Sequence, residues 1–149
     1  MSENRMFFHC KKCGNVEGSI FKTGTMSIAC CGEQMELLVP NIADEEEGDH
    51  FPFIESSRNN QLEISIGLPV HPAEEDHYIS FVFIDTIYGS QVKRMKTHPC
   101  DEPVEPFFTF SFSQDSPKII YSYCTRHGLW KTVFEDQVNM FSMRYQGSY

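Results

Sequence analysis

The chain is organised around Tyr123-Cys124-Thr125-Arg126-His127-Gly128-Leu129-Trp130, which follows a strand-like run from Lys118 to Tyr123. Gly128 allows a sharp bend, so a turn between two strands is expected here. The Cys124 thiol and the His127 imidazole stand three positions apart, a spacing that lets both bind one metal ion. By itself, the tetrapeptide from Cys124 to His127 is more typical of a buried structural cysteine beside a surface histidine. The metal interpretation therefore depends on histidines elsewhere in the chain.

Alternation of apolar and polar residues indicates further strands around this turn. Within residues 61–68, the apolar residues up to Leu68 occupy one face, and Glu63 and Ser65 occupy the other. Aromatic and β-branched residues are plentiful and favour strands, and no long helical period is present in the sequence. The pattern predicts a mainly β fold, an antiparallel β-sandwich. The expected strands are 61–68, 78–87, 91–96, 108–112, 118–124 and 130–135.

The composition excludes several classes of protein. The 149 residues are 40% hydrophobic and 22% charged, as in a soluble chain with one core and a small appendage. A net charge of −9 argues against a nucleic-acid partner, because phosphate binding needs a basic face. No apolar run reaches transmembrane length, and a charged Cys-x-x-Cys segment stands where a secretory signal would be apolar. We therefore expect a cytoplasmic protein without a membrane partner.

Four of the six cysteines lie close to the amino terminus, as Cys10-x-x-Cys13 and the adjacent pair Cys30-Cys31. In a reducing cytoplasm such cysteines are metal ligands more often than disulfides. Four thiolates form a closed tetrahedral site for zinc or for a single iron, and ligand identity leaves both open. So short a segment buries little core, so the metal is expected to supply much of its folding free energy. Because the four thiolates already complete the coordination of the metal, His9 is not needed as a ligand and is expected to be exposed.

A second set of candidate ligands lies at strand ends or in loops of the expected sandwich. It contains His50, His71, His77, Cys124 and His127. These are five donors, which is more than a tetrahedral structural site needs. A purely structural zinc protein is therefore the least favoured interpretation. The acidic stretch 44–49 before the first of these histidines predicts a solvated loop at a domain boundary.

These motifs resemble those of a known family. The segment Phe8 to Met35 resembles desulforedoxin, a small iron module with the same Cys-x-x-Cys and vicinal Cys-Cys-Gly-Glu motifs. The motifs His50-x-Pro, His71-Pro-x-x-x-x-His77-x-Ile and Tyr123-Cys124-x-x-His127-Gly-Leu-Trp130 resemble the iron-binding motifs of superoxide reductase. Over roughly residues 7–131 the chain resembles desulfoferrodoxin, the two-iron form. The resemblance implies a four-Cys iron module at 1–38 and an immunoglobulin-like β-sandwich at 39–149, with an extension after about residue 131 and a homodimeric assembly.

The resemblance also implies the cofactors and the reaction. One iron would be bound by the thiolates of Cys10, Cys13, Cys30 and Cys31, and the other by equatorial His50, His71, His77 and His127 with axial Cys124. The sixth position of the second iron would be open. Superoxide would bind there, take one electron and two protons, and leave as hydrogen peroxide. A rubredoxin-like carrier would then re-reduce the iron.

The chain departs from the family just before His50, where Gly48-Asp49 replace Glu-Lys. In the family the Glu can occupy the sixth position and the Lys helps to attract superoxide, whereas Asp49 would repel an anion. We consider that Arg126 or another basic residue attracts superoxide, that a nearby Glu reaches the iron, or that Asp49 occupies the sixth position. The other basic residues considered for attracting superoxide are Lys118 and Lys131. The glutamates considered for reaching the iron are Glu46 and Glu47.

The loss of Glu-Lys leaves a second function open. An iron-dependent electron-transfer or sensing protein with weak reductase activity would keep the ligands and lose fast turnover. The sequence does not identify the electron donor, nor does it separate iron from zinc at the four-Cys site. Cys100 is interpreted as a free thiol, and residues 132–149 are apolar enough to pack on the sandwich or on a partner subunit.

Overall fold

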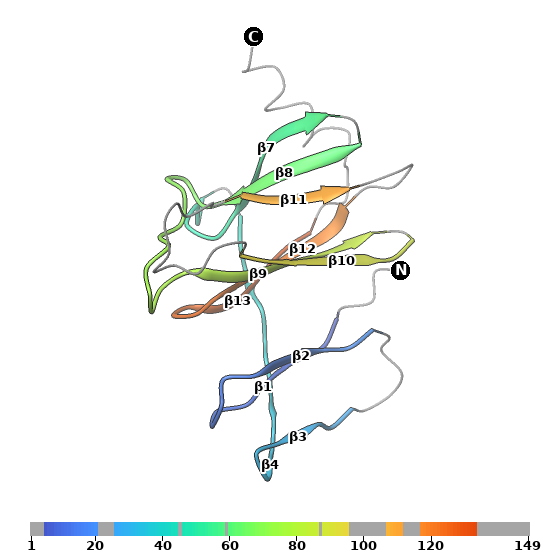
Figure 1. The fold of residues 1–149 in the computed structure, drawn as a ribbon, viewed down its shortest axis with the longest axis vertical. Helices are drawn as coiled ribbons and strands as arrows, with labels where there is room; N and C mark the ends of the chain where they lie inside the picture. Colours follow the sequence, from blue (N-terminus) through green and yellow to red (C-terminus); the bar gives the residue numbers. More distant parts are fainter. Residues whose placement is uncertain are drawn as a thin grey trace. The chain divides into compact units, whose positions relative to one another are not determined.

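The computed structural model describes residues 5–20, 26–44, 46–58, 60–86, 88–95, 107–111 and 117–133. Every regular element within these ranges is a β-strand (Figure 1), which confirms the predicted all-β fold. None of these residues forms a helix that could cross a membrane. The chain divides into two compact units, Met1–Val39 and Pro40–Tyr149, and each has a hydrophobic cluster of its own.

The first unit has five short strands in its described part. They are β1 (Phe7–His9), β2 (Val16–Gly18), β3 (Ala29–Cys30), β4 (Glu33–Gln34) and β5 (Glu36–Leu37). β1 pairs antiparallel with both β2 and β5, whereas β3 and β4 form a separate ribbon. Only Phe8, Cys10 and Met35 form the buried cluster among the described residues of this unit. His9 is half-buried within β1, so the prediction that it is exposed is wrong.

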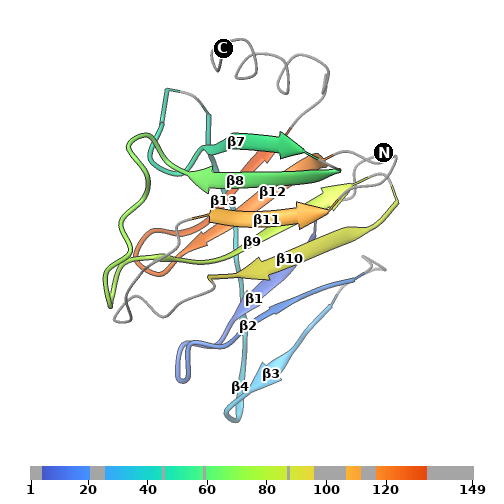
Figure 2. The same cartoon turned by 45° about the horizontal axis from the view of Figure 1, so that its top comes forward.

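The described part of the second unit is a sandwich of two sheets (Figure 1, Figure 2). Its strands are β6 (Asn41–Ile42), β7 (Pro52–Arg58), β8 (Gln61–Ile66), β9 (Ile79–Thr86), β10 (Ser90–Arg94), β11 (Phe107–Ser111), β12 (Pro117–Cys124) and β13 (Gly128–Val133). One sheet has the order β10-β9-β12-β13-β6 and the other has the order β11-β8-β7. Neighbouring strands are antiparallel, except that β6 pairs parallel with β13.

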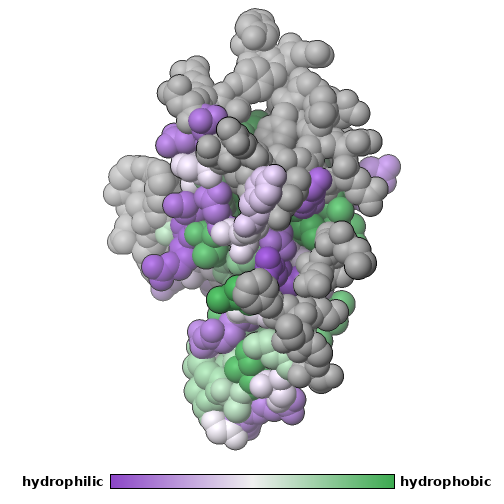
Figure 3. Space-filling model, turned by 90° about the vertical axis from the view of Figure 1, so that its right-hand side faces the viewer, coloured by the Kyte–Doolittle hydropathy of each residue, from purple (hydrophilic) through white to green (hydrophobic). Residues whose placement is uncertain are grey.

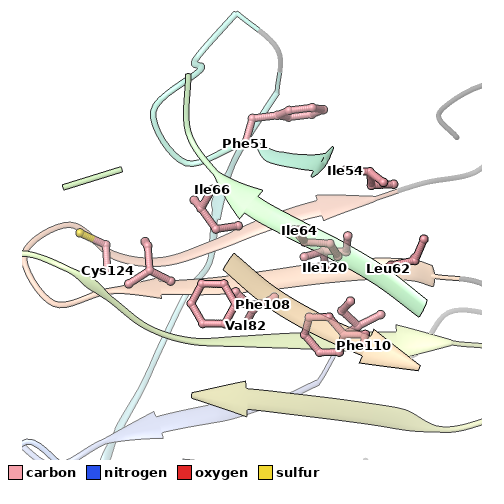
Figure 4. Packing of buried hydrophobic residues seen from close by; sticks show 12 residues of the cluster. Phe51, Ile54, Leu62, Ile64, Ile66, Val82, Phe108, Phe110, Ile120 and Cys124 are labelled. Atoms are coloured by element: carbon pink, nitrogen blue, oxygen red, sulfur yellow. The ribbon is translucent and has the colours of Figure 1, made fainter. Parts of the chain in front are cut away.

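The core of this unit lies between the two sheets, and Figure 4 shows its side chains. Ile64 of β8, Ile84 of β9 and Phe110 of β11 are fully buried. The alternation of apolar residues predicts this for β8 and β11, and the apolar character of both faces predicts it for β9. Cys124 belongs to the same cluster, lies at one end of it and has no exposed surface. The strand that carries this sulfur is therefore anchored by the most buried part of the protein.

The end of β8 differs from the prediction. The strand stops at Ile66, so Leu68 is 62% exposed instead of facing the core. Gly67 has a φ of +89°, and a Cβ there would lie 2.6 Å from the carbonyl oxygen of Asp49. Glycine is thus required by a close approach of two backbone segments that the alternation pattern cannot reveal. Ser65, predicted on the polar face, is fully buried and donates to Glu55 Oε1 at 2.6 Å.

Several sequence predictions fall on residues outside the described ranges. They concern the strand ends at residues 87, 96, 112 and 134–135, the free thiol of Cys100 and the carboxyl-terminal extension. The remaining strand boundaries agree within two residues.

Exposed apolar side chains come from separate elements of both units. The most exposed are Val39 at 82%, Tyr88 at 79% and Ile20 at 73%. In Figure 3, hydrophobic and hydrophilic residues are interspersed on the visible face. Single exposed apolar residues are ordinary on protein surfaces.

Candidate metal centres

The four-Cys cluster lies in two turns of the first unit. Cys10 and Cys13 follow β1, Cys30 ends β3, and Cys31 lies in the turn between β3 and β4. The four sulfur atoms all lie within 4.8 Å of one another. The Sγ atoms of Cys13 and Cys30 are 3.6 Å apart. Cys31 adopts a φ of 53°, in the left-handed region that residues with a Cβ rarely occupy.

The electrostatics of this cluster fit a bound cation. Hydrogen bonding from the backbone N–H of Cys13 lowers the pKa of the Cys10 thiol to about 7. In contrast, hydrogen bonding with the Cys13 side chain raises the pKa of Cys30 to about 12. Thiols this close therefore share protons and resist full ionisation, unless a metal ion compensates the charge. The donor set suits either a tetrathiolate iron or zinc.

The second cluster brings together four imidazoles from separate loops. His50 precedes β7, His71 follows β8, His77 precedes β9, and His127 lies in the turn between β12 and β13. The ring centroids of successive neighbours are separated by 5.2 Å for His50–His71, 4.8 Å for His71–His77, 5.0 Å for His77–His127 and 5.3 Å for His127–His50. The four rings therefore form a closed quadrilateral. Neighbouring rings are tilted or edge-on, and none of these pairs is stacked.

Cys124 adds a thiol to this ring. Its Sγ and the donor nitrogens of His50, His71 and His127 lie within 4.8 Å of one another. The Cys124 sulfur is 3.6 Å from His127 Nδ1 and accepts a hydrogen bond of 3.3 Å from the backbone N–H of His127. An N–H donor to a thiolate stabilises its charge and tunes the potential of a metal that it binds. His77 lies beside these residues, with its ring edge-on to those of His71 and His127.

Hydrogen bonds identify the nitrogen that each ring turns toward the centre. His50 Nδ1 is 2.8 Å from Glu47 Oε1, and His71 Nδ1 is 2.9 Å from the carbonyl oxygen of Pro72. Both rings therefore present Nε2, whereas His127 presents Nδ1 beside the sulfur. The Nε2 atoms of His50 and His77 are buried and have no hydrogen-bond partner among the described residues. Buried nitrogens without a partner are costly, and a metal ion would satisfy them.

Burial keeps two of these rings in the form that binds metals. It lowers the pKa of His71 to about 4 and also lowers the pKa of His77. Both imidazoles are therefore neutral near pH 7, and neutral imidazole is the ligand form. Metal binding there requires no loss of a proton from His71.

Three further contacts connect the loops of the site. Trp130 stacks on His50 with ring centroids 4.1 Å apart and an interplanar angle of 4°. Thr125 bridges the turn after β12 to the loop that carries His77. Its backbone N–H donates to the carbonyl of Tyr78 at 3.0 Å, and its hydroxyl donates to the carbonyl of Asp76 at 3.1 Å. No role was predicted for Trp130 or Thr125 from the sequence, because neither residue type is a common metal ligand.

The residues considered for attracting superoxide lie outside the ring. Arg126 forms an exposed ion pair with Asp76, with Nη2 3.0 Å from Oδ2. Asp49 is exposed, and its backbone N–H donates to the carbonyl of Glu47 at 2.8 Å. Lys118 and Lys131 are half-buried. Glu47, expected in a solvated loop, instead contacts His50, so that part of the loop prediction is wrong.

Comparison with known proteins gives the family. The family model described as desulfoferrodoxin matches residues 42–133, which include all five residues of the second cluster. The chain belongs to the desulfoferrodoxin family. A desulfoferrodoxin homolog of Methanothermobacter thermautotrophicus is 33% identical over 130 residues, covering 87% of this chain and 99% of that protein. The desulfoferrodoxin of Syntrophotalea carbinolica is 31% identical over 132 residues, covering 89% of this chain and 98% of that protein.

The fold agrees with this family. The superoxide reductase of Treponema pallidum aligns with a TM-score of 0.70 at 23% identity, covering 87% of this chain and 98% of that one. The predicted resemblance to desulfoferrodoxin is thus confirmed, and so is the mainly β fold. The four-Cys cluster and the cluster of histidines with Cys124 match the two-iron arrangement of the desulfoferrodoxins.

Proposed function

We propose that this chain reduces superoxide to hydrogen peroxide at an iron held by its second cluster. The ligands would be His50, His71, His77, His127 and Cys124. The closed ring of four imidazoles beside a buried thiol is the observation that most supports this proposal. Five donors are one fewer than a six-coordinate iron accepts, which would leave a position for substrate. Bound ferrous iron would supply one electron, and with two protons superoxide would become hydrogen peroxide.

The other parts of the proposal concern electron supply and assembly. Each turnover oxidises the iron, so a small carrier of the rubredoxin class would have to return one electron. We propose that Cys10, Cys13, Cys30 and Cys31 bind the second iron. The reducing conditions that keep these thiols available favour a cytoplasmic location. A homodimer is proposed from the family resemblance.

Stopped-flow mixing of the iron-loaded, reduced protein with superoxide tests the activity. We expect rapid loss of superoxide with one peroxide formed per iron oxidised, and no oxygen evolved. Cys124→Ser should abolish the fast phase, because it removes the thiolate donor of the second site. Cys31→Ser is the matched control, since it removes a thiolate from the other cluster and should leave the fast phase in place. Persistence of superoxide with iron bound would contradict the proposal.

A second function, electron transfer or sensing, is favoured by one observation. Asp49 is exposed immediately before His50, so it places a negative charge where an anionic substrate would approach. Slow consumption of superoxide by the iron-loaded protein, with rapid reversible oxidation by a small redox carrier, would support this second function.

Arg126 is the residue that we propose attracts superoxide, because it lies between Cys124 and His127 and is half-exposed. Arg126→Ala should lower the superoxide rate and flatten its dependence on ionic strength. Arg94→Ala removes the same charge from exposed β10 and serves as the control. Asp76→Asn should raise the rate, since it releases Arg126 from its ion pair. An unchanged rate and salt dependence in Arg126→Ala would exclude this role.

A further inference from the structure

Glu47 contacts His50 through both carboxylate oxygens, one at the imidazole ring and one at the backbone. Oε1 lies 2.8 Å from His50 Nδ1, and Oε2 accepts the backbone N–H of His50 at 2.9 Å. The His50 side chain is only 4% exposed, and that of Glu47 is 22% exposed. The contact is therefore largely shielded from water, unlike the exposed ion pairs elsewhere on this protein.

The backbone holds Glu47 in this position. The N–H of Glu47 donates to Asp44 Oδ1 at 2.8 Å, and the N–H of Gly48 donates to the carbonyl of Asp44 at 3.1 Å. Gly48 adopts a φ of 74°, a value that favours glycine, and the turn there brings His50 back onto the side chain of Glu47. The carbonyl of Gly48 then accepts the N–H of Leu68 at 3.1 Å. The loop is thus tied at both ends, and glycine at position 48 serves this turn.

The hydrogen bond determines the tautomer of His50. A carboxylate accepts this hydrogen bond, so Nδ1 carries the hydrogen, and in the neutral imidazole that binds a metal Nε2 then carries the lone pair. Nε2 is the buried atom of His50 that has no partner among the described residues. With Nδ1 turned to Glu47, Nε2 is the His50 nitrogen left for the cluster with His71, Cys124 and His127. A carboxylate behind a ligating imidazole makes that ligand more basic and holds its ring in place.

We propose that Glu47 is a positioning residue, which orients His50 and strengthens it as a donor from outside the metal's coordination shell. Because both of its oxygens are engaged by His50, Glu47 does not occupy the sixth position. The inference rests on the proposed iron site. It gives the acidic loop a function at that site, although the Glu-Lys pair is absent from the positions before His50.

Ferrous-iron affinity, measured anaerobically by chelator competition, tests this role. Glu47→Gln keeps the size of the side chain, but its amide offers a donor where the carboxylate offered an acceptor. We expect the affinity of the second site to fall about 10–100-fold, as for other outer partners of metal-binding histidines. Glu46→Gln makes the same charge change at an exposed neighbour and should leave the affinity unchanged. The midpoint potential should rise in Glu47→Gln, because a less basic imidazole stabilises ferric iron less.

Two comparisons separate this role from the alternatives. Glu47→Asp keeps the charge and should recover part of the affinity, whereas a purely structural role of the loop would make it no better than Glu47→Gln. In a His50→Ala background, Glu47→Gln should have no further effect, whereas a direct ligand would still lose affinity. Wild-type affinity in Glu47→Gln would overturn the inference and leave the iron site standing. Absence of ferrous iron from the second site of the wild-type protein would overturn both.

Discussion

At the scale of single residues, the indole of Trp130 stacks on the imidazole of His50. The two rings are nearly parallel with centroids 4.1 Å apart, so Trp130 covers one face of the imidazole, and Glu47 contacts the ring at Nδ1. Trp130→Ala should reduce the stability of the metal-free protein by about 2 kcal/mol, through lost packing and stacking. It should also speed the release of iron from the second site. Circular dichroism during heating and chelator-induced loss of colour measure the two effects.

Trp130→Phe is the control for the indole. A phenyl ring retains a flat face for His50. Trp130→Phe should therefore lose less than half of the stability that Trp130→Ala loses. The indole Nε1 of Trp130 is buried and has no partner among the described residues, so replacing it removes no hydrogen bond seen there. Equal losses in the alanine and phenylalanine variants would show that stacking on His50 contributes little.

At the scale of elements, β6 holds the turn that carries His127. It pairs parallel with β13, and the Asn41 amide donates to the carbonyls of His127 at 3.4 Å and Leu129 at 3.2 Å. Asn41→Ala should reduce the free energy of unfolding of the second unit by about 1 kcal/mol, the usual net value of such a hydrogen bond. Urea unfolding followed by the fluorescence of Trp130, the single tryptophan, measures this change.

Asn41→Asp sharpens this prediction. It has nearly the same shape but places a carboxylate against two carbonyl oxygens, so it should be more destabilising than Asn41→Ala. If the aspartate variant is as stable as the wild type, the amide does not hold this turn.

At the scale of the whole molecule, the two units differ in how much they depend on metal. In the described residues, three side chains form the buried cluster of the first unit, whereas twelve form that of the second. A closed four-thiolate site supplies on the order of 10 kcal/mol to a small fold. Removal of both metals should therefore unfold the first unit and leave the sandwich folded. Hydrogen exchange should show lost protection at the Phe8 amide and retained protection at Ile64.

Cys124→Ser provides the comparison for metal removal. It weakens only the second site, so the Phe8 amide should stay protected as long as the four-Cys site is loaded. Simultaneous loss of protection at Phe8 and Ile64 on chelation would show that the two units do not unfold independently.

The sequence predicts much of this fold because the relevant signals are local. Apolar residues at every second position marked β8, and a run that is apolar on both faces marked β9 as a central strand. The prediction was wrong at Leu68, where the chain leaves the strand at Gly67. The backbone of Asp49, a segment distant in sequence, approaches this turn closely, and the turn is closed locally by a hydrogen bond from the His71 N–H to the carbonyl of Ile66.

By itself, the sequence determined which donors are present, since ligand chemistry is a property of the side chains. The spacing of the cysteines and histidines was therefore enough to predict two metal sites. The tertiary structure alone decided that Glu47 faces His50, that Trp130 covers its ring and that Arg126 pairs with Asp76. The last two of these contacts join segments that are far apart in the sequence. Their packing is set by the register of the sheets and by the core between them, which no short motif encodes.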